Sequence, residues 1–218
     1  MDYSPLLISI KTSLAATAAA FVSGIAAAWF VMRIRRFRNL VDGIFTIPLV
    51  LPPTVTGFFL LVLFGKNGPA GNLLMKHDLT VVFTWTATVI ASSVVAFPLM
   101  YRAAKASFEQ LDQDLIYSAR TLGMSEKDIF FRVILPNCRY GILSGTILAF
   151  ARAMGEFGAT VIIAGNIPGK TQTMALAVYT AIQSGDRALA YNWAVIILAI
   201  SLAAVILMNR ISQKGDMR

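Results

Sequence analysis

The chain has 218 residues, a formal net charge of +8 at pH 7 and a mean hydropathy of +0.69. Hydrophobic residues make up 57% of it and charged residues 14%, whereas soluble domains carry about 25% charged and about 45–50% apolar residues. This composition excludes an ordinary soluble domain and indicates one membrane-embedded domain over residues 1–218. The positive charge lies in clusters beside apolar segments, which is typical of membrane topology rather than of nucleic-acid binding.

Five apolar runs are long enough to cross a bilayer as helices, which takes about 20 residues each. In chain order they cover residues 6–32, 41–64, 79–101, 140–164 and 191–208. Prolines interrupt the second run. A shorter apolar stretch, residues 171–183, predicts an interfacial or re-entrant helix between the last two runs. The expected fold class is therefore an all-α membrane protein with about five transmembrane helices.

The basic residues fall into two groups that predict the orientation of these spans. The larger group of thirteen is Arg33, Arg35, Arg36, Arg38, Arg102, Lys105, Arg120, Lys127, Arg132, Arg139, Arg210, Lys214 and Arg218. The smaller group is Lys11, Lys66, Lys76, Lys170 and Arg187, while Arg152 lies inside a span. Because the basic-rich side faces the cytoplasm, we expect the N-terminus outside and the C-terminus inside. Positive charge after the first run favours a retained anchor over a cleaved signal peptide.

Residues 103–138 connect the third and fourth runs and are expected to form a cytoplasmic hairpin. Apolar residues in its first part recur at helical spacing and predict an amphipathic helix; they are Phe108, Leu111, Leu115 and Ile116. Ser125 is typical of the start of a second helix, Gly123 predicts the turn between the two, and Pro136 is expected to end the second. Such a knob either docks on another protein or is a solvated hairpin without a partner.

The stretch from Tyr117 to Gly123, followed by Leu135 and Pro136, resembles the EAA signature of ABC importer permeases. Ala119, the glycine and the Leu-Pro pair match that signature at its spacing, while a tyrosine replaces its usual glutamate. The resemblance implies coupling helices that dock in a groove of a nucleotide-binding subunit, without an acidic anchor at the first position. The implied coupling residues are Asp114, Leu115, Ala119, Arg120, Thr121, Leu122, Gly123, Met124 and Pro136.

Further segments resemble the molybdate-type permeases of this superfamily. They are residues 47–57, 64–68, 151–159 and 165–173. The resemblance implies a homodimeric permease that imports molybdate, with sulfate and tungstate permeases as alternatives. It also implies an extracytoplasmic binding protein that delivers the anion and cytoplasmic ABC ATPase subunits that bind ATP and Mg²⁺. No cofactor is expected on this chain.

The second apolar run suits a path for an oxyanion because prolines free backbone carbonyls in a helix. Lipid tolerates such breaks only where protein or a water-filled cavity covers them. The hydroxyls of Thr54 and Thr56 could donate to a tetrahedral anion or re-satisfy the freed backbone. Pro52, Pro53, Thr54 and Thr56 are therefore candidates for the substrate pathway.

Arg152 and Glu156 are four residues apart in the fourth run and share one helix face. An ionisable pair inside a span normally faces the bundle interior or an aqueous path. Two interpretations stay open: an element of the pathway or its gate, or an internal ion pair that only orients the helices. Direct contact between Glu156 and the anion is not expected, since like charges repel.

The Gly-Lys-Thr sequence at 169–171 resembles the end of a P-loop, but that motif needs a glycine where Ala164 stands. The chain is therefore expected neither to bind ATP nor to be an enzyme, and no catalytic residue is predicted. A single histidine and a single cysteine, far apart in sequence, predict no metal site. The more distant alternatives are a secondary transporter or channel, whose inverted repeats are not visible, and a membrane scaffold.

Overall fold

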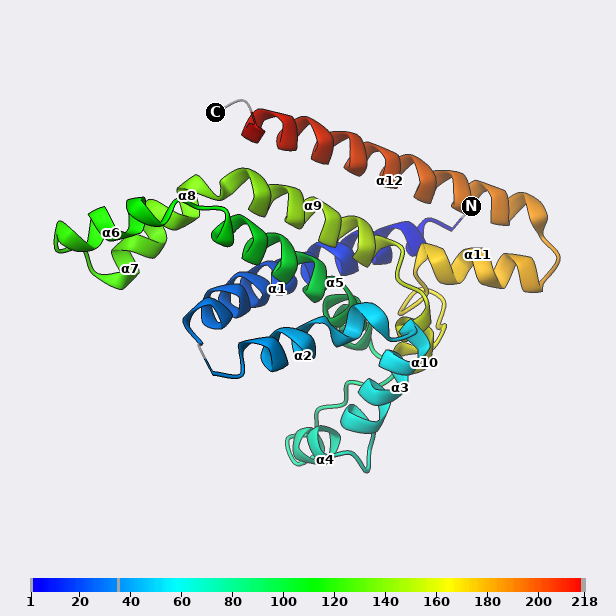
Figure 1. The fold of residues 1–218 in the computed structure, drawn as a ribbon. Helices are drawn as coiled ribbons and strands as arrows, with labels where there is room; N and C mark the ends of the chain where they lie inside the picture. The colour runs from blue at the N-terminus through cyan, green and yellow to red at the C-terminus, as the bar shows by residue number, and fades with distance from the viewer. Residues whose placement is uncertain (1, 35, 217–218) are drawn as a thin grey trace.

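The computed structural model describes the backbone of residues 2–34 and 36–216, and the side chains of these residues as far as Ile211. Helices make up most of this part of the chain, and no strand occurs within it. In chain order they are α1 (Ser4–Arg33), α2 (Arg38–Val50), α3 (Pro53–Phe64), α4 (Pro69–Met75), α5 (Trp85–Glu109), α6 (Gln113–Thr121), α7 (Glu126–Asp128), the π-helix η1 (Ile129–Ile134), α8 (Leu135–Asn137), α9 (Arg139–Met154), α10 (Gly158–Ala164), α11 (Met174–Gln183) and α12 (Arg187–Asp216) (Figure 1).

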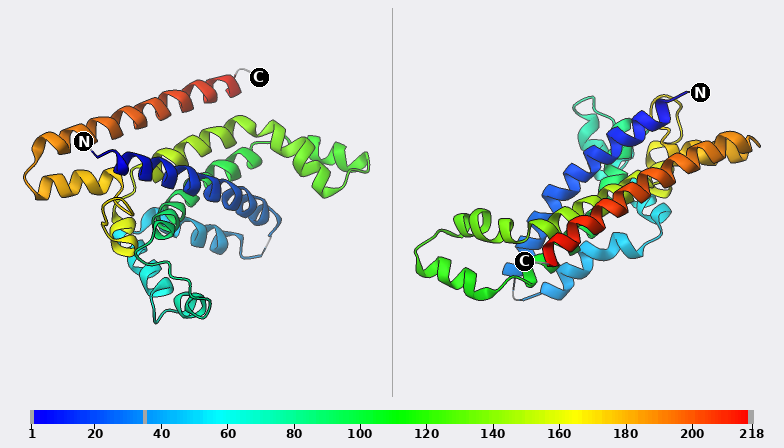
Figure 2. Two further views of the ribbon diagram at one scale, coloured as in Figure 1. Left: turned by 180° about the vertical axis from the view of Figure 1, so that it is seen from behind. Right: turned by 90° about the horizontal axis from the view of Figure 1, so that it is seen from above.

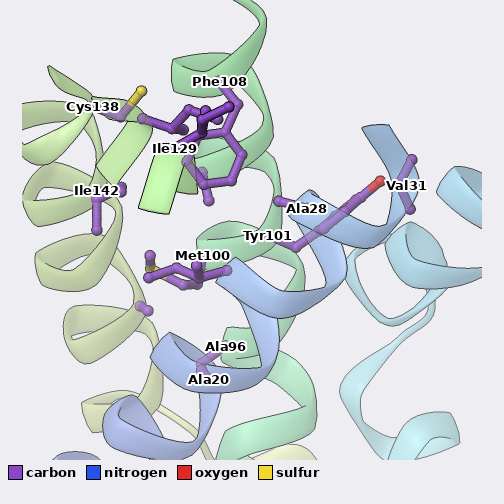
Figure 3. Packing of buried hydrophobic residues seen from close by; sticks show 14 of the residues in the cluster. Ala20, Ala28, Val31, Ala96, Met100, Tyr101, Phe108, Ile129, Cys138 and Ile142 are labelled. Carbon is purple, nitrogen blue, oxygen red and sulfur yellow. The ribbon is translucent and has the colours of Figure 1, made fainter. Parts of the chain in front are cut away.

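The centre of the molecule is a packed group of α1, α5 and α9. Small residues let these helices approach closely, as is common in membrane bundles. A Cβ on Gly24 of α1 would lie 2.9 Å from Met100 Cγ of α5, and one on Gly145 of α9 would lie 2.4 Å from the Cβ of Ala103. Figure 3 shows Met100 in the middle of this apolar core, with alanines at the contact between α1 and α5.

The predicted count of about five membrane helices is confirmed, although two of the five are broken. Within the described residues, α1, α5 and α12 are each long and apolar enough to cross a membrane. The pair α2–α3 bends by 110°, and the α7–α8 segment meets α9 at 74°. The predicted run 140–164 is wrong as a single helix, because α9 ends at Met154 and α10 starts at Gly158. The helix of the third apolar run, α5, starts at Trp85, later than predicted, because residues 79–84 form an irregular segment with a turn at 82–83.

The ends of the central helices lie together with the α6–α7 hairpin at one end of the molecule. This end holds the last turns of α1, α5 and α12 and the first turns of α2 and α9 (Figures 1 and 2). Arg33, Arg38 and Arg210 therefore lie on the hairpin side, as the charge pattern predicts. Arg35, Arg218 and the side chain of Lys214 lie outside the described residues. Which side of the membrane this end occupies stays a prediction.

Aromatic and polar contacts together attach α2 to α5, although none of the α2 residues, all of which are described, is fully buried. Phe45 of α2 packs edge to face against two aromatic rings of α5. Lys105 Nζ lies 2.8 Å from Asp42 Oδ1, and the Tyr101 hydroxyl donates to the same carboxylate. Arg38, at the start of α2, pairs with Glu109 at the end of α5. The break at Leu51–Pro52 then turns the chain into α3. This break places α3 beside α10 at the opposite end from the hairpin (Figure 1).

The hairpin forms as predicted at its start and differs at its end. The Asp112 side chain caps α6 by accepting from Asp114 N, the Ser125 hydroxyl caps α7, and Gly123 takes φ +76° in the turn. The helical segment that contains Pro136 ends at Asn137, one residue after the predicted end. Proline has no N–H to donate into the preceding turn, and a wide π-helical turn precedes it, as such turns interrupt α-helices elsewhere.

The chain's one cysteine, Cys138, lies where the hairpin passes into α9. Its side chain is buried, and its Sγ donates to the backbone oxygen of Ser107 at 3.2 Å. Figure 3 shows it beside Phe108 and Ile129 at the base of the hairpin. This residue therefore packs as part of the core that joins the hairpin to the membrane helices.

Candidate functional site

The exposed face of α6 carries a shallow groove at the tip of the molecule. We call it the docking groove, and its lining residues are Asp114, Tyr117, Ser118, Thr121 and Leu122. Leu122 leaves 81% of its surface exposed at the end of the helix. Leu115 and Tyr117 of the same short helix are exposed as well, and exposed apolar side chains that gather outside the membrane spans are typical of a surface that binds a partner.

The predicted coupling residues divide into exposed and buried positions. Asp114, Leu115, Arg120, Thr121, Leu122, Gly123 and Pro136 are exposed, and Met124 is half-buried. Ala119 is buried with Ile116 against the core, so it supports the groove from beneath. Tyr117 and Ser118 also line the groove, although both depart from the signature, which has glutamate and alanine at these positions. Their helical spacing with Asp114 and Thr121 was the signal that could have identified them.

The Arg120 guanidinium is half-exposed and forms an ion pair with another residue of the hairpin. Its Nε donates to Glu126 Oε1 at 2.8 Å and its Nη2 to Oε2 at 3.3 Å. Arg33, at the end of α1, also donates to Glu126 Oε2 at 3.2 Å. The Arg120 hydrogen bonds hold the pKa of the Glu126 carboxyl below its usual value. Neither Glu126 nor its contact with Arg33 is apparent from the sequence, because the two residues are far apart along the chain.

The predicted pathway residues of α3 lie against the start of α10. A Cβ on Gly158 would lie 2.9 Å from Pro53 Cβ and 3.2 Å from Thr54 N. One turn further along, a Cβ on Gly57 would lie 2.7 Å from Ala159 Cα. The structure thus brings the proline break of the second apolar run next to the break between α9 and α10. Two glycines are needed at this crossing because backbone meets backbone there.

The hydroxyls at this crossing differ in their surroundings. Pro52 and Thr54 are exposed, whereas Thr56 is buried at 5% exposure. Its Oγ1 has no hydrogen-bond partner among the described residues, and neither has the buried Oγ1 of Thr160 on α10. Thr56 therefore does not re-satisfy a carbonyl freed by the prolines in this conformation. Thr160 was missed from the sequence, because an isolated threonine in an apolar run carries no pattern.

Glu156 is the most buried charged residue of the described chain, with 1% of its surface exposed. Its Oε1 accepts from Ala159 N at 2.8 Å, which caps the first turn of α10. Its Oε2 lies 2.7 Å from Nη1 of Arg152, whose side chain is 29% exposed. The carboxylate therefore joins the end of α9 to the start of α10. Both interpretations of this pair, an element of the pathway or its gate and an ion pair that orients the helices, stay predictions.

Glu156→Gln should destabilise the protein by about 1–3 kcal/mol, because the amide would leave the Arg152 charge unpaired. The amide oxygen can still accept from Ala159 N, so the loss isolates the ion pair. Thermal unfolding in detergent would measure it. The double variant Arg152→Gln with Glu156→Gln should recover part of the stability, since no lone charge remains. An unchanged melting temperature for Glu156→Gln would contradict a structural role for the pair.

The bundle of broken and continuous membrane helices, with its projecting hairpin, defines the class as a multi-pass α-helical membrane protein. Its fold resembles the methionine transporter MetNI in an inward-facing form, with TM-score 0.75, 15% identity and coverage of 97% of this chain and 94% of that one. It also resembles a chain of a bacterial alginate ABC transporter complexed with a periplasmic protein that holds an alginate pentasaccharide, with TM-score 0.70, 17% identity and coverage of 96% and 79%.

The chain belongs to the family described as binding-protein-dependent transport system inner membrane components, whose model matches residues 20–214. It is 42% identical to a putative molybdenum transport system permease protein, YvgM, of Bacillus subtilis, over 91% of this chain and 88% of that protein. It is 39% identical to the molybdenum transport system permease protein ModB of Escherichia coli K12, over 94% and 91%. It is 34% identical to a sulfate transport system permease protein, CysW, of Synechococcus elongatus, over 84% and 65%.

Proposed function

We propose that this chain is the transmembrane permease subunit of an ATP-driven importer that translocates molybdate or a related tetrahedral oxyanion. Membership of the family supports the transport role, and the molybdenum permeases among its relatives support the substrate. The observation that carries the proposal is the exposed docking groove, held at one end of the membrane bundle. A binding surface at this end of the bundle suits a partner protein that lies outside the membrane and moves the membrane helices through the hairpin.

In this proposal the docking groove binds a cytoplasmic ABC ATPase subunit. That subunit binds ATP and Mg²⁺, and this chain holds neither. Two copies of the chain form a homodimer around one central path, with one hairpin seated in each ATPase. Closure of the ATPase pair moves the hairpins as rigid bodies, and the membrane helices respond by opening the path outward. An extracytoplasmic binding protein then delivers the anion.

The crossing of α3 and α10 is the proposed wall of the path. It combines a proline break, two buried hydroxyls without partners and an exposed Thr54 at the start of α3. At this helix start Pro52 and Pro53 have no N–H and Val55 N already donates to Pro52 O. The Thr54 N–H and the positive dipole end of the helix are therefore what favour an anion there. Hydroxyls and N–H groups suit a tetrahedral oxyanion because they donate without a full charge that would hold it too tightly. The Arg152–Glu156 pair fixes the angle at which α10 meets this wall.

Sulfate is the second candidate substrate, because a sulfate permease is among the relatives at 34% identity. Sulfate, molybdate and tungstate share charge and tetrahedral shape, and a permease path meets each of them after the binding protein has selected it. The chain could therefore serve any of the three anions, depending on its binding protein. Measurement of uptake separates these possibilities.

The uptake of radioactive molybdate tests the proposal in cells that lack their own molybdate and sulfate importers. Cells that express this chain with its own ATPase and binding protein should accumulate the label, and excess unlabelled tungstate should compete better than sulfate. Cells without this chain provide the background. Sulfate competition equal to that of unlabelled molybdate would favour the sulfate assignment. Uptake that persists with an ATPase unable to hydrolyse ATP would favour a secondary transporter.

A further inference from the structure

Three elements meet at the base of the hairpin in one aromatic cluster. Trp29 of α1 lies 4.8 Å from Phe130 of η1 between ring centroids, and Phe108 of α5 lies 6.2 Å from the same Phe130. Trp29 and Phe108 also contact each other edge to face. Aromatic pairs of this kind add packing energy beyond the area they bury. The returning arm of the hairpin is therefore fixed to two membrane helices.

A second link lies on the outer side of this cluster and involves charge. The Arg33 guanidinium lies 4.2 Å from the Trp29 ring centroid, which holds it over the ring face. From there Arg33 reaches Glu126 Oε2, while Arg120 binds both oxygens of the same carboxylate. Isolated surface ion pairs contribute little, but two arginines on one carboxylate, one of them bidentate, form a network. This network joins both arms of the hairpin to the end of α1.

We propose that Glu126 is a positioning residue that locks the coupling hairpin to α1, so that α1 is the first membrane helix to follow the motion of the ATPase. This inference rests on the proposed function, because it concerns how the motion of an ATPase bound at the docking groove reaches the membrane helices. Glu126, across the Gly123 turn from α6, anchors the hairpin inward to its own membrane helix.

The proposal predicts a change in coupling without a loss of docking. Glu126→Gln keeps the side-chain volume at a half-exposed site and lies outside the docking groove. The variant should co-purify with the ATPase at the wild-type ratio, yet its substrate transported per ATP hydrolysed should fall about fivefold, as expected when a network of this size is lost. Arg33→Gln should reproduce the loss, and Arg33→Lys should restore most of it, because the cation remains.

Arg132→Gln is the matched control for Arg33→Gln, since each of the two variants removes one positive charge from the same end of the molecule. Arg132 is 75% exposed at its side chain and pairs with Asp128, one turn earlier in the same arm, so its loss leaves the link to α1 intact. It should transport within about twofold of the wild type, as surface substitutions usually do. Hydrogen exchange provides a second readout: amides of residues 113–128 should exchange faster in Glu126→Gln and Arg33→Gln than in Arg132→Gln.

The complex reconstituted with its ATPase and binding protein in liposomes gives all of these measurements. Wild-type coupling and exchange in Glu126→Gln would overturn the proposal, as would an equal loss in Arg132→Gln. A loss of the ATPase from Glu126→Gln would also overturn it, because the residue would then act in docking. If the wild-type chain itself failed to bind an ATPase, the proposed function would fall, and that result is distinct from any of these.

Discussion

Gly123→Pro should abolish assembly with the ATPase. Gly123 has φ +76°, whereas proline is fixed near −65°. Its N–H also donates to Arg120 O at 2.9 Å, and proline has no such hydrogen. The two losses should destabilise the hairpin turn by about 3 kcal/mol or more, which corresponds to a loss of docking affinity of about 100-fold. The measurement is the ratio of ATPase to permease after affinity purification of the complex.

Gly185→Pro is the control for this result, because Gly185 has almost the same local geometry at the other end of the molecule. Its φ is +78° and its N–H donates to Ile182 O at 3.1 Å, in the turn between α11 and α12. This variant should suffer similar local strain but keep the ATPase. Gly123→Ala should give an intermediate loss, since a left-handed conformation costs a residue with a Cβ about 1–2 kcal/mol. Normal substrate-stimulated ATP turnover in Gly123→Pro would count heavily against a coupling role for the hairpin.

Gly57→Val should lower the melting temperature more than any other single change at the α3–α10 crossing. The new Cβ would lie 2.7 Å from Ala159 Cα and 2.8 Å from its backbone oxygen, and backbone cannot move aside as a flexible side chain can. Overpacking of this kind costs about 3 kcal/mol. For a chain of this length that corresponds to a shift of about 6–12 °C. Thermal unfolding of the purified protein in detergent measures it, and transport should fall as the two helices separate.

Gly43→Val provides the comparison within the same bent pair of helices. Gly43 lies in α2 with nothing within 4 Å of the position a Cβ would take. The substitution there should leave stability unchanged or slightly raised, since glycine is a poor helix former. A melting temperature for Gly57→Val that matches that of Gly43→Val would mean that α3 and α10 can separate without cost. The crossing could not then be a fixed wall of the path.

Local patterns predicted the hairpin well because its signals act over a few residues. Ser125 caps its helix and Gly123 takes a positive φ, as their side-chain chemistry requires. The predicted end at Pro136 differs from the observed end by one residue. The π-helical turn before the proline was missed, because no composition rule reports such a turn. The apolar helix predicted within residues 171–183 is present as α11, with its start at Met174.

Breaks inside apolar runs were harder to predict than the runs themselves. Hydropathy measures how apolar a segment is and not whether it forms one continuous helix. Residues 140–164 were therefore predicted to be a single span. Glu156 was visible as a charge in that span, but its bond to Ala159 N depends on the chain bending after Met154. The contact between Glu126 and Arg33 joins residues whose separation in sequence hides it. Long-range contacts of this kind come from packing and leave no local pattern.

The burial of Cys138 has a practical consequence for mapping this molecule. Its thiol is buried and donates to the backbone oxygen of Ser107, and buried structural cysteines of this kind are chemically inert. The natural chain should therefore give almost no background with maleimide reagents, although it contains a cysteine. Single cysteines placed in exposed turns, such as the one that joins α11 to α12, can then be labelled one at a time with membrane-impermeant reagents. Intact cells would reveal which turns face outward without first altering the native residue that packs the hairpin against the core.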